Sequence, residues 1–494
     1  MWKSITVVAA LAAAVEGAAV ESRGNYTALV SSELLRNSVT IEALAAKAKH
    51  LERLAYDTPT NNRVIGSEGH QATVDWITGI IEQFPDYYTI SHQGVPLNIG
   101  GSANVTILGE PTTAYAVGFA PGGSVSGKLA AVKNLGCDAS DHPTNATGSI
   151  FLISRGSCVS GQKVLLAKKA GAIGVLIYNN VDEGNLDGYS LQRIGAEGEY
   201  VPTAGISLGY GKGLAAAVSG GLAVPVTLST TSRDIITYNI NVQTIAGDPD
   251  NVIHVSGHSD SVGSGPGIND NGSGSISLLE IAIQLTNFTV NNAVRFSWWT
   301  GEEIGLLGAD YYVTHLNQTE KDKIRLLLDF DMMASPNYAF QIYDGDGSAF
   351  NLTGAPGSAE AEHEFAHYFN DIAKVNHTEI EFDGRSDYGP FLEAGIAAGG
   401  IACGAEGLKT QEEFELFGGA SGLAYDVNYH EDGDNANNLN YDAWIVMAQA
   451  IAHSTATYAV SFDSLPPRNS TAIKSRAAKN LFKYKQSPGY LKMI

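Results

Sequence analysis

The sequence is poor in cysteine, and this scarcity excludes one class of metal site. The chain has 494 residues but only three cysteines, Cys137, Cys158 and Cys403. Three cysteines cannot supply a tetrahedral site of four thiolates, so any metal ion must be bound by histidine and carboxylate side chains. Cys137 and Cys158 flank a turn-rich loop and are able to pair in an oxidising compartment. Cys403 is then expected to be a buried free thiol.

Basic residues are also scarce. The chain has 30 Lys and Arg against 52 Asp and Glu, a formal net charge of −22. Binding to nucleic acid requires a basic face, so we expect no nucleic-acid partner. An acidic surface of this kind attracts cations, but its ordinary role is to keep a protein soluble.

After residue 17 the sequence has no apolar run long enough to cross a membrane. Residues 1–17 carry Lys3 near the start, then an apolar stretch and small residues, which is typical of a secretory signal peptide. We therefore expect export of the chain, either out of the cell or into a vacuole, and no membrane association. Residues 18–37 are predicted to be a propeptide or a linker.

Nine Asn-x-Ser/Thr sequons fit this secretory route and predict N-linked glycans. One of them, at Asn271, is doubtful because it lies in a glycine-rich loop beside Asp270. The sequons begin at Asn25, Asn104, Asn145, Asn271, Asn287, Asn317, Asn351, Asn376 and Asn469.

The composition that remains, 44% apolar and 17% charged, is enough for a large core and two domains. Residues 38–107 and 233–465 are predicted to form one domain. Residues 108–232, with short apolar strands separated by turn residues, are predicted to form a small β-rich insert without catalytic groups. Residues 466–494 begin with Pro-Pro and contain seven Lys or Arg and no acidic residue, which predicts a loosely ordered basic tail.

Strands and helices alternate beyond the insert, which predicts a sheet covered by helices on both faces. Strands are predicted at residues 235–244, 252–258, 294–300, 324–331, 378–382 and 399–403. Helices are predicted at residues 273–285, 305–315, 359–373, 386–394 and 441–457. Before the insert, helices are predicted at residues 38–57 and 67–84 and an edge strand at 87–97. Within the insert, strands are predicted at 149–154 and 174–178 and a helix at 161–171.

Residues able to do chemistry follow the ends of these strands. They are His258, Asp260, Asp270, Glu302, Glu303, Asp331 and, in a loop before the last helix, Tyr429 and His430. Any one of them has an ordinary structural explanation, such as an Asp that caps the next helix. Unrelated residues would be scattered along the chain, whereas most of these lie at the carboxyl ends of successive strands, where α/β proteins bind ligands.

Two His, two Asp and one Glu suit a pair of divalent metal ions, most naturally zinc. Asp270 is the natural bridge between the two ions, because it lies on glycine-rich backbone between the first ligand and the others. Glu302 and Glu303 are adjacent and must lie on a bend, so that one binds metal while the other takes a proton from water. Asp260 is placed to accept the second N–H of His258.

Six segments resemble the two-zinc aminopeptidases of family M28, most closely the secreted fungal leucine aminopeptidases of the aminopeptidase Y type. They are GHSDSV, GPGINDNGSG, WWTGEEIGLLG, LLLDFDMMASPN, GRSDYGPF and DVNYHEDGDNANN. The resemblance covers residues 38–465, and the insert is similar to a protease-associated (PA) domain. It implies an α/β fold, with a mixed central sheet sandwiched by helices and the PA domain inserted.

The resemblance also implies a role for each site residue. One zinc ion would be bound by His258 and Asp331, the other by Glu303 and His430, with Asp270 bridging them. The implied catalytic groups are Glu302 as general base, Asp260 as the partner of His258, Arg385 near the amino end of the substrate, and Tyr429 as a donor to the oxyanion.

The sequence departs from its relatives at several places. Where many relatives have two cysteines around the Tyr-His pair, this chain has Asn428 and Gly433, so we expect the His430 loop to be held by other contacts. Where many have Asp-Asp at the bridging position, it has Asp270-Asn271, and a cis peptide is predicted there.

The expected activity is removal of the N-terminal residue, leucine or another apolar one, from peptides with a free N-terminus by a monomeric enzyme. Two alternatives stay open. One is a binding protein without catalysis on the same scaffold. The other is a related zinc carboxypeptidase or glutaminyl cyclase.

Overall fold

A computed structural model describes residues 28–180, 191 and 200–467 of the chain. The predicted signal peptide, residues 18–27 and the basic tail from residue 468 lie outside the described residues. Within the described residues, no helix combines the length and apolarity needed to cross a membrane.

The larger domain is built on a mixed sheet with the strand order β13-β12-β14-β11-β9-β10-β8, and β1 pairs with β8. Strands β14, β11, β9 and β10 are parallel, whereas β8 is antiparallel to β10 and β12 is antiparallel to β14. The bounds are β1 Tyr88–Ile107, β8 Pro225–Thr244, β9 Asp248–His258, β10 Asn292–Trp299, β11 Ile324–Phe330, β12 Gln341–Tyr343, β13 Thr378–Ile380 and β14 Ala398–Ala402.

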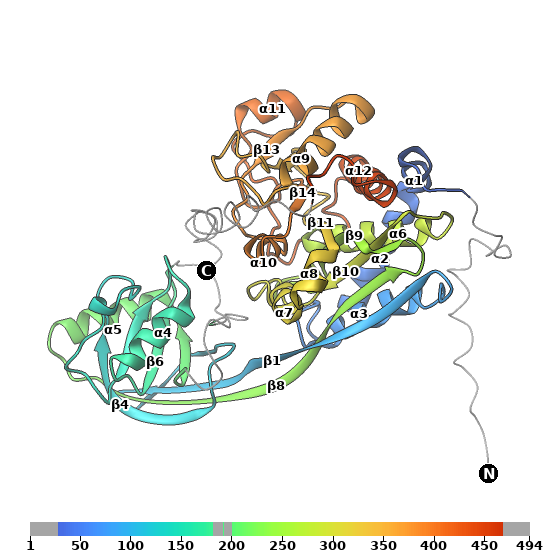
Figure 1. Ribbon diagram of the computed structural model, residues 1–494. Helices are drawn as coiled ribbons and strands as arrows, with labels where there is room; N and C mark the ends of the chain where they lie inside the picture. The colour runs from blue at the N-terminus through green and yellow to red at the C-terminus, as the bar shows by residue number, and fades with distance from the viewer. Residues whose placement is uncertain (1–27, 181–190, 192–199, 468–494) are drawn as a thin grey trace, which may run out of the picture.

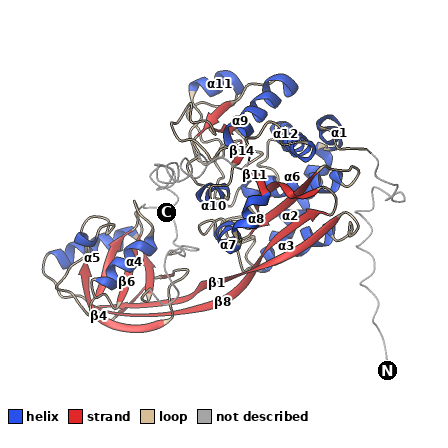
Figure 2. Ribbon diagram, viewed as in Figure 1, coloured by secondary structure: helices blue, strands red, loops and turns tan. Residues whose placement is uncertain are grey.

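Helices cover both faces of this sheet (Figure 2). They are α1 Ser32–Ser38, α2 Ile41–Tyr56, α3 Glu68–Ile81, α6 Gly274–Leu285, α7 Leu307–His315, α8 Gln318–Lys323, α9 Ser358–His367, α10 Tyr388–Glu393, α11 Gln411–Phe417 and α12 Tyr441–Val460. A π-helical turn, Ile268–Ser273, precedes α6, and another, Tyr368–Ala373, follows α9.

Helix α2 shows why the predicted segments became helices. The Thr40 side chain caps its first turn by accepting a hydrogen bond from a backbone N–H. Leu44, Ala48, Leu51 and Ala55 are buried and recur every three or four residues, so they form one apolar stripe on the helix, which packs against α3, α6 and α12.

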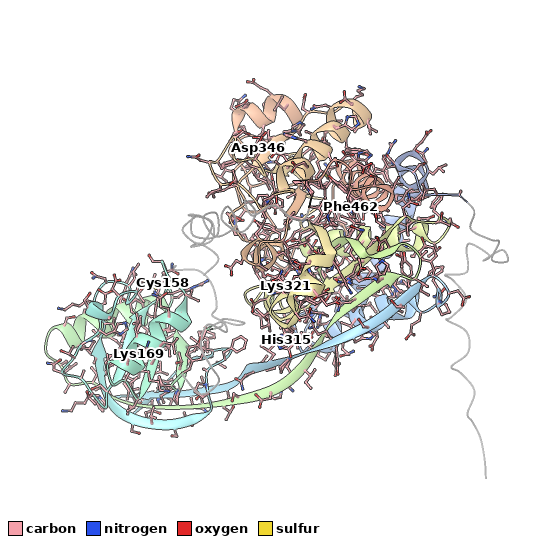
Figure 3. The ribbon with its side chains drawn as sticks, in the orientation of Figure 1. Cys158, Lys169, His315, Lys321, Asp346 and Phe462 are labelled. Carbon is pink, nitrogen blue, oxygen red and sulfur yellow. A yellow bond between two sulfur atoms is a disulfide. The ribbon has the colours of Figure 1, made fainter. Side chains whose placement is uncertain are left out.

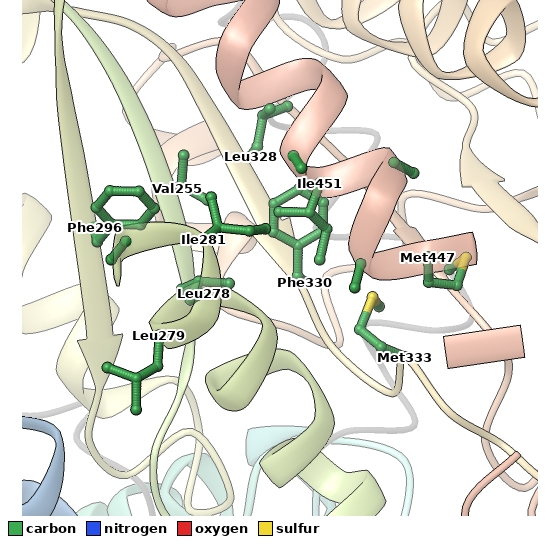
Figure 4. Packing of buried hydrophobic residues seen from close by; sticks show 14 of the residues in the cluster. Val255, Leu278, Leu279, Ile281, Phe296, Leu328, Phe330, Met333, Met447 and Ile451 are labelled. Atoms are coloured by element: carbon green, nitrogen blue, oxygen red, sulfur yellow. The ribbon is translucent and has the colours of Figure 1, made fainter. Parts of the chain in front are cut away.

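Alternation along the strands divides the core into two layers. On β11, Leu326 and Leu328 pack in the larger cluster, whereas Leu327 between them packs in the smaller cluster on the opposite face. On β10, Phe296 and Trp299 divide in the same way. Figure 4 shows the larger layer, where residues of β9, β10 and β11 pack against α6 and α12.

The insert is a separate α/β unit at the far end of two long strands (Figure 1). Its elements are β2 Glu110–Thr112, β3 Tyr115–Ala116, β4 Gly123–Ala131, a short 3₁₀ turn at Ala139–Asp141, β5 Ile150–Ser154, α4 Ser160–Lys169, β6 Gly174–Tyr178, β7 Thr203–Ile206 and α5 Leu208–Ser219. Cys137 and Cys158 form the expected disulfide, and Cys403 is a buried free thiol. Figure 3 shows Cys158 and Lys169 on this unit, away from the labelled residues of the larger domain.

Strands β1 and β8 run from the larger domain into the insert without interruption. β1 continues ten residues beyond the predicted end at residue 97, and β8 begins ten residues before its predicted start at 235. The predicted boundary at residues 232–233 therefore lies inside β8, whereas β1 ends in a turn at Leu108 and Gly109. The division into domains remains a prediction.

The predicted fold class is confirmed, but some elements differ. The helix predicted at 359–373 changes at Tyr368 from an α-helix to a π-helical turn. The sequence patterns do not predict helices α1, α5, α8 and α11 or strands β2, β3, β4, β7 and β12. These elements are short or weakly amphipathic, so they leave little periodic signal.

Candidate metal centre and active site

The sheet brings the predicted residues to one edge. His258 ends β9, Asp331 follows β11, and Glu302 follows β10. In the parallel register Ser256 pairs with Asp329, and His258 and Asp331 each lie two residues farther on, so they are level at the carboxyl edge. Residues distant along the chain therefore meet where parallel strands end.

Asp270 lies between the two histidines. Its Oδ1 is 3.3 Å from His258 Nε2, and its Oδ2 is 3.0 Å from His430 Nε2. Asp331 Oδ1 lies 3.6 Å from His258 Nε2, and Glu303 Oε2 lies 3.1 Å from His430 Nε2. Two groups of side chains therefore share the Asp270 carboxylate. One group is His258, Asp270 and Asp331, and the other is Asp270, Glu303 and His430. In each group the possible ligand atoms lie within 4.8 Å of one another.

Glu302 and Glu303 lie on a turn after β10, as expected, so both side chains face the site. Gly301 has φ +71, a conformation that glycine adopts without strain, and it turns the chain at this point. Glu302 Oε2 is 3.8 Å from His258 Nε2, so Glu302 is beside the first group of ligands while Glu303 belongs to the second.

Several buried atoms of the site have no hydrogen-bond partner among the described residues. They are both ring nitrogens of His258, Oε1 of Glu303 and Oδ1 of Asp331. A buried polar atom without a partner costs free energy, so such a concentration is typical of a site that binds a ligand. Imidazole nitrogens and carboxylate oxygens are donors that suit a divalent transition metal.

The electrostatics of the site point the same way. Burial raises the pKa of Glu302 well above its ordinary value, and Glu303 and Asp331 raise it further against the opposing effect of His258. Burial lowers the pKa of His430, but Glu303 and Asp270 outweigh burial and raise it to about 11. The cluster of buried carboxylates therefore favours a positively charged group at this site.

Asp260 joins the His258 loop to the glutamate turn. Its Oδ1 accepts hydrogen bonds from the backbone N–H groups of Gly301 at 2.9 Å and Glu302 at 3.3 Å. The same oxygen faces His258 Nδ1 at 3.7 Å, longer than a hydrogen bond. The role of Asp260 as acceptor of the His258 N–H therefore remains a prediction.

Tyr429 and Arg385 border the same cavity, which has a volume of about 340 Å³. The Tyr429 ring stacks on the His430 ring with centroids 3.8 Å apart. Arg385 Nη1 forms an ion pair with Glu406 at 2.7 Å, and its Nη2 lies 3.5 Å from the Tyr429 hydroxyl.

The loop that carries His430 is held by amide side chains in place of the cysteines. Asn428 Nδ2 donates to Asn438 Oδ1 at 2.6 Å, and Asn438 Nδ2 donates to both oxygens of Asp426 at 2.9 Å. A Cβ at Gly433 would lie 2.1 Å from Asn428 Oδ1, so any larger residue there would displace this amide. The predicted cis peptide between Asp270 and Asn271 is present.

Three polar residues around the site were missed by the sequence analysis. The Ser386 hydroxyl donates to Asp331 Oδ2 at 2.9 Å. Arg63 and Asp434 contact the backbone of the loop that carries Asp270. The role of Arg63 and Asp434 is recognisable only from their burial in the structure. Hydrogen bonds to backbone groups leave no pattern of ligand residues in a sequence.

Comparisons with known proteins identify relatives of the chain. Residues 239–455 match Peptidase family M28, and residues 125–214 match the PA domain. The chain is 45% identical to probable leucine aminopeptidase 2 of Aspergillus fumigatus over 91% of this chain and 89% of the relative. It is 44% identical to leucine aminopeptidase 2 of Arthroderma otae over 94% of this chain and 93% of the relative.

Solved structures share the fold at low sequence identity. An aminopeptidase from Aneurinibacillus sp. strain AM-1 aligns with a TM-score of 0.66 and 22% identity, over 88% of this chain and 97% of that structure. A zinc aminopeptidase from Bacillus subtilis aligns with a TM-score of 0.61 and 20% identity, over 90% of this chain and 98% of that structure. On the strength of its fungal relatives, the chain belongs to peptidase family M28, and it carries a PA domain.

Proposed function

We propose that this protein is a secreted aminopeptidase that removes the N-terminal residue of peptides with a two-zinc centre and a glutamate general base. The observation that carries the proposal is the position of Asp270, whose two carboxylate oxygens face two different histidines. The ions of a two-metal site lie about 3.5–4 Å apart, and a carboxylate that faces both ligand groups is suited to be shared between them. The relatives named leucine aminopeptidase 2 and the structural neighbours named zinc aminopeptidases support the same conclusion.

The proposed ligands of one zinc ion are His258 and Asp331, and those of the other are Glu303 and His430, with Asp270 shared. The unpartnered buried ring nitrogens and carboxylate oxygens support this assignment. Bound at these residues, zinc would supply Lewis acidity, which polarises a carbonyl and lowers the pKa of water to about 7.

Glu302 is the proposed general base. Its carboxylate lines the cavity beside the ligand groups but is not needed in either group that shares Asp270. Asp260 accepts a hydrogen bond from the Glu302 backbone N–H, so the carboxylate that faces His258 also fixes the peptide that carries the base. Glu302 would take a proton from the attacking water and return it to the leaving amine.

Tyr429 and Arg385 are proposed to bind polar groups of the substrate. The Tyr429 hydroxyl borders the cavity, where it would donate to the oxyanion that forms on the scissile carbonyl. Arg385 is anchored by Glu406 and would lie near the amino end of the substrate.

The proposed substrate is a peptide with a free N-terminus and an apolar first residue. Carboxylates at the cavity, including Glu302 and Asp331, provide the negative charge that a free α-amine needs. The apolar part of the cavity would accept the first side chain, and its lining includes Met332, Tyr343, Ile380 and Ala402.

Export, glycosylation and a monomeric state are part of the proposal. The sequence features that support export lie in residues 1–17. Asn271 is completely buried, and its amide donates to Phe330 O at 2.8 Å, so the sequon at Asn271 is not a glycan site in the folded protein. The other eight sequons remain candidates.

The alternatives are less well supported. A binding protein without catalysis would have no reason to keep every ligand position together with Glu302. A carboxypeptidase needs a free cation for the carboxylate of its substrate, whereas Arg385 is already paired with Glu406.

Hydrolysis of aminoacyl-nitroanilides, with and without a chelator, tests the proposal. We expect cleavage of leucine and other apolar derivatives, loss of activity with chelator, and recovery with zinc. Peptides with a blocked amino group should not be cleaved. Cleavage of blocked peptides, or activity that chelators leave unchanged, would contradict the proposal.

A further inference from the structure

The loop from Ser259 to Asp270 is held on one side by a buried cation. Arg63 is completely buried and forms no ion pair within salt-bridge distance among the described residues. Its guanidinium donates to the carbonyl oxygens of Ser259, Pro266 and Gly267, the second at 2.7 Å, and its Nη2 lies 3.5 Å from Asp270 O. The Ser259 carbonyl lies next to His258 at the start of the loop, and the other carbonyls lie at or near its end at Asp270.

The same loop is held on the opposite side by a buried anion. Asp434 is 2% exposed, and its Oδ1 accepts the backbone N–H of Asn269 at 2.7 Å while its Oδ2 accepts that of Asp270 at 2.9 Å. Its own carbonyl accepts the N–H of Ile268 at 3.1 Å. Asp434 belongs to the loop that carries His430, so it couples the backbone of the shared carboxylate to the second histidine.

The two charges are complementary in what they bind. The cation takes carbonyl oxygens of the loop, and the anion takes its amide hydrogens. Glycines at positions 263, 265 and 267 would otherwise leave this segment free to move. Gly267 has φ +62, and a Cβ there would lie 3.0 Å from Arg63 Nη2, so glycine permits the close approach. Burying charged groups with only backbone partners is costly, which indicates a specific role.

We propose that Arg63 and Asp434 are positioning residues that fix the Asp270 carboxylate between the two metal sites and thereby set metal affinity. The inference rests on the proposed two-zinc centre, because Arg63 and Asp434 would hold Asp270, the ligand that the two zinc ions would share. Neither residue belongs to the proposed ligand groups or to the lining of the cavity. Residues that orient metal ligands in this way typically contribute about 10–100-fold to metal affinity.

Competition with a zinc chelator tests the inference on the full-length protein. Asp434→Asn keeps the size of the side chain but replaces one acceptor by a donor that faces a backbone N–H. Arg63→Lys keeps the charge but cannot reach all of the carbonyl oxygens. We expect each variant to bind zinc about 10–100-fold more weakly than the parent protein. Activity should return when zinc is raised by a similar factor.

A matched control separates positioning from support of the fold. Lys163 in the PA domain is also completely buried and donates to two backbone carbonyls, Ser154 O at 2.7 Å and Gly156 O at 2.6 Å. Lys163→Met should lower the melting temperature but leave zinc affinity unchanged.

The outcomes distinguish this inference from the proposed function. If the parent protein binds no zinc, the proposed function fails. If the parent binds zinc and both variants bind it equally tightly, only the inference is overturned. If neither variant folds, or if Lys163→Met weakens zinc binding as much as they do, the two residues support the fold generally and the inference is overturned as well.

Discussion

At the scale of the residue, two adjacent glutamates have different surroundings. Glu303 Oε2 faces His430 at 3.1 Å, and Glu303 lies in a ligand group with Asp270. Glu302 lies next to His258 and faces the cavity. The turn after β10 therefore allows neighbouring carboxylates to serve as ligand and as base.

Glu302→Gln tests this division of roles. The amide keeps the shape of the side chain but cannot take a proton, so kcat should fall about 10²–10⁴-fold while zinc content stays unchanged. Steady-state kinetics together with elemental analysis checks both parts. Nearly normal kcat in the variant would show that Glu302 is not the base, and loss of zinc would show that it is a ligand.

At the scale of the element, the site depends on where strands end and on how the next loop is held. The apolar runs that became β9, β10 and β11, followed by His258, Glu302 and Asp331, made the sheet edge and the site predictable from the sequence. The supports of the loops were not predictable. Arg63 and Asp434 bind backbone groups, and such contacts depend on tertiary packing.

Gly433→Ala tests how the His430 loop is held. The new Cβ would meet Asn428 Oδ1, and moving that amide breaks its hydrogen bond to Asn438. Overpacking of this kind costs about 1–3 kcal/mol, so we expect a lower melting temperature and a lower kcat/KM.

Asn428→Ala in the Gly433→Ala background is the matched control, because it removes the atom that clashes. The double variant should then lose less stability than the sum of the two single variants. Strictly additive losses would contradict the proposed contact between these residues.

At the scale of the whole molecule, β1 and β8 connect two units (Figure 1). In the described residues, every group of side chains suited to a metal ion lies in the larger domain. The PA domain has its own core and a disulfide between residues 21 positions apart.

Removal of this disulfide should therefore affect stability without affecting chemistry. Cys137→Ser with Cys158→Ser is expected to cost about 3 kcal/mol, because the crosslink limits the unfolded chain. Differential scanning calorimetry should show a lower melting temperature for the PA domain. The kcat for an aminoacyl-nitroanilide and the zinc content should match the parent protein, and a large fall in either would contradict this expectation.

The most direct test of the account is the number of zinc ions bound per chain. Elemental analysis of zinc-saturated protein, after removal of free metal, should give two zinc ions in the parent protein. His430→Ala should reduce the number, because it removes a ligand from one group and leaves His258, Asp270 and Asp331 in place. One zinc ion or none in the parent protein would contradict the claim that Asp270 is shared between two metal ions.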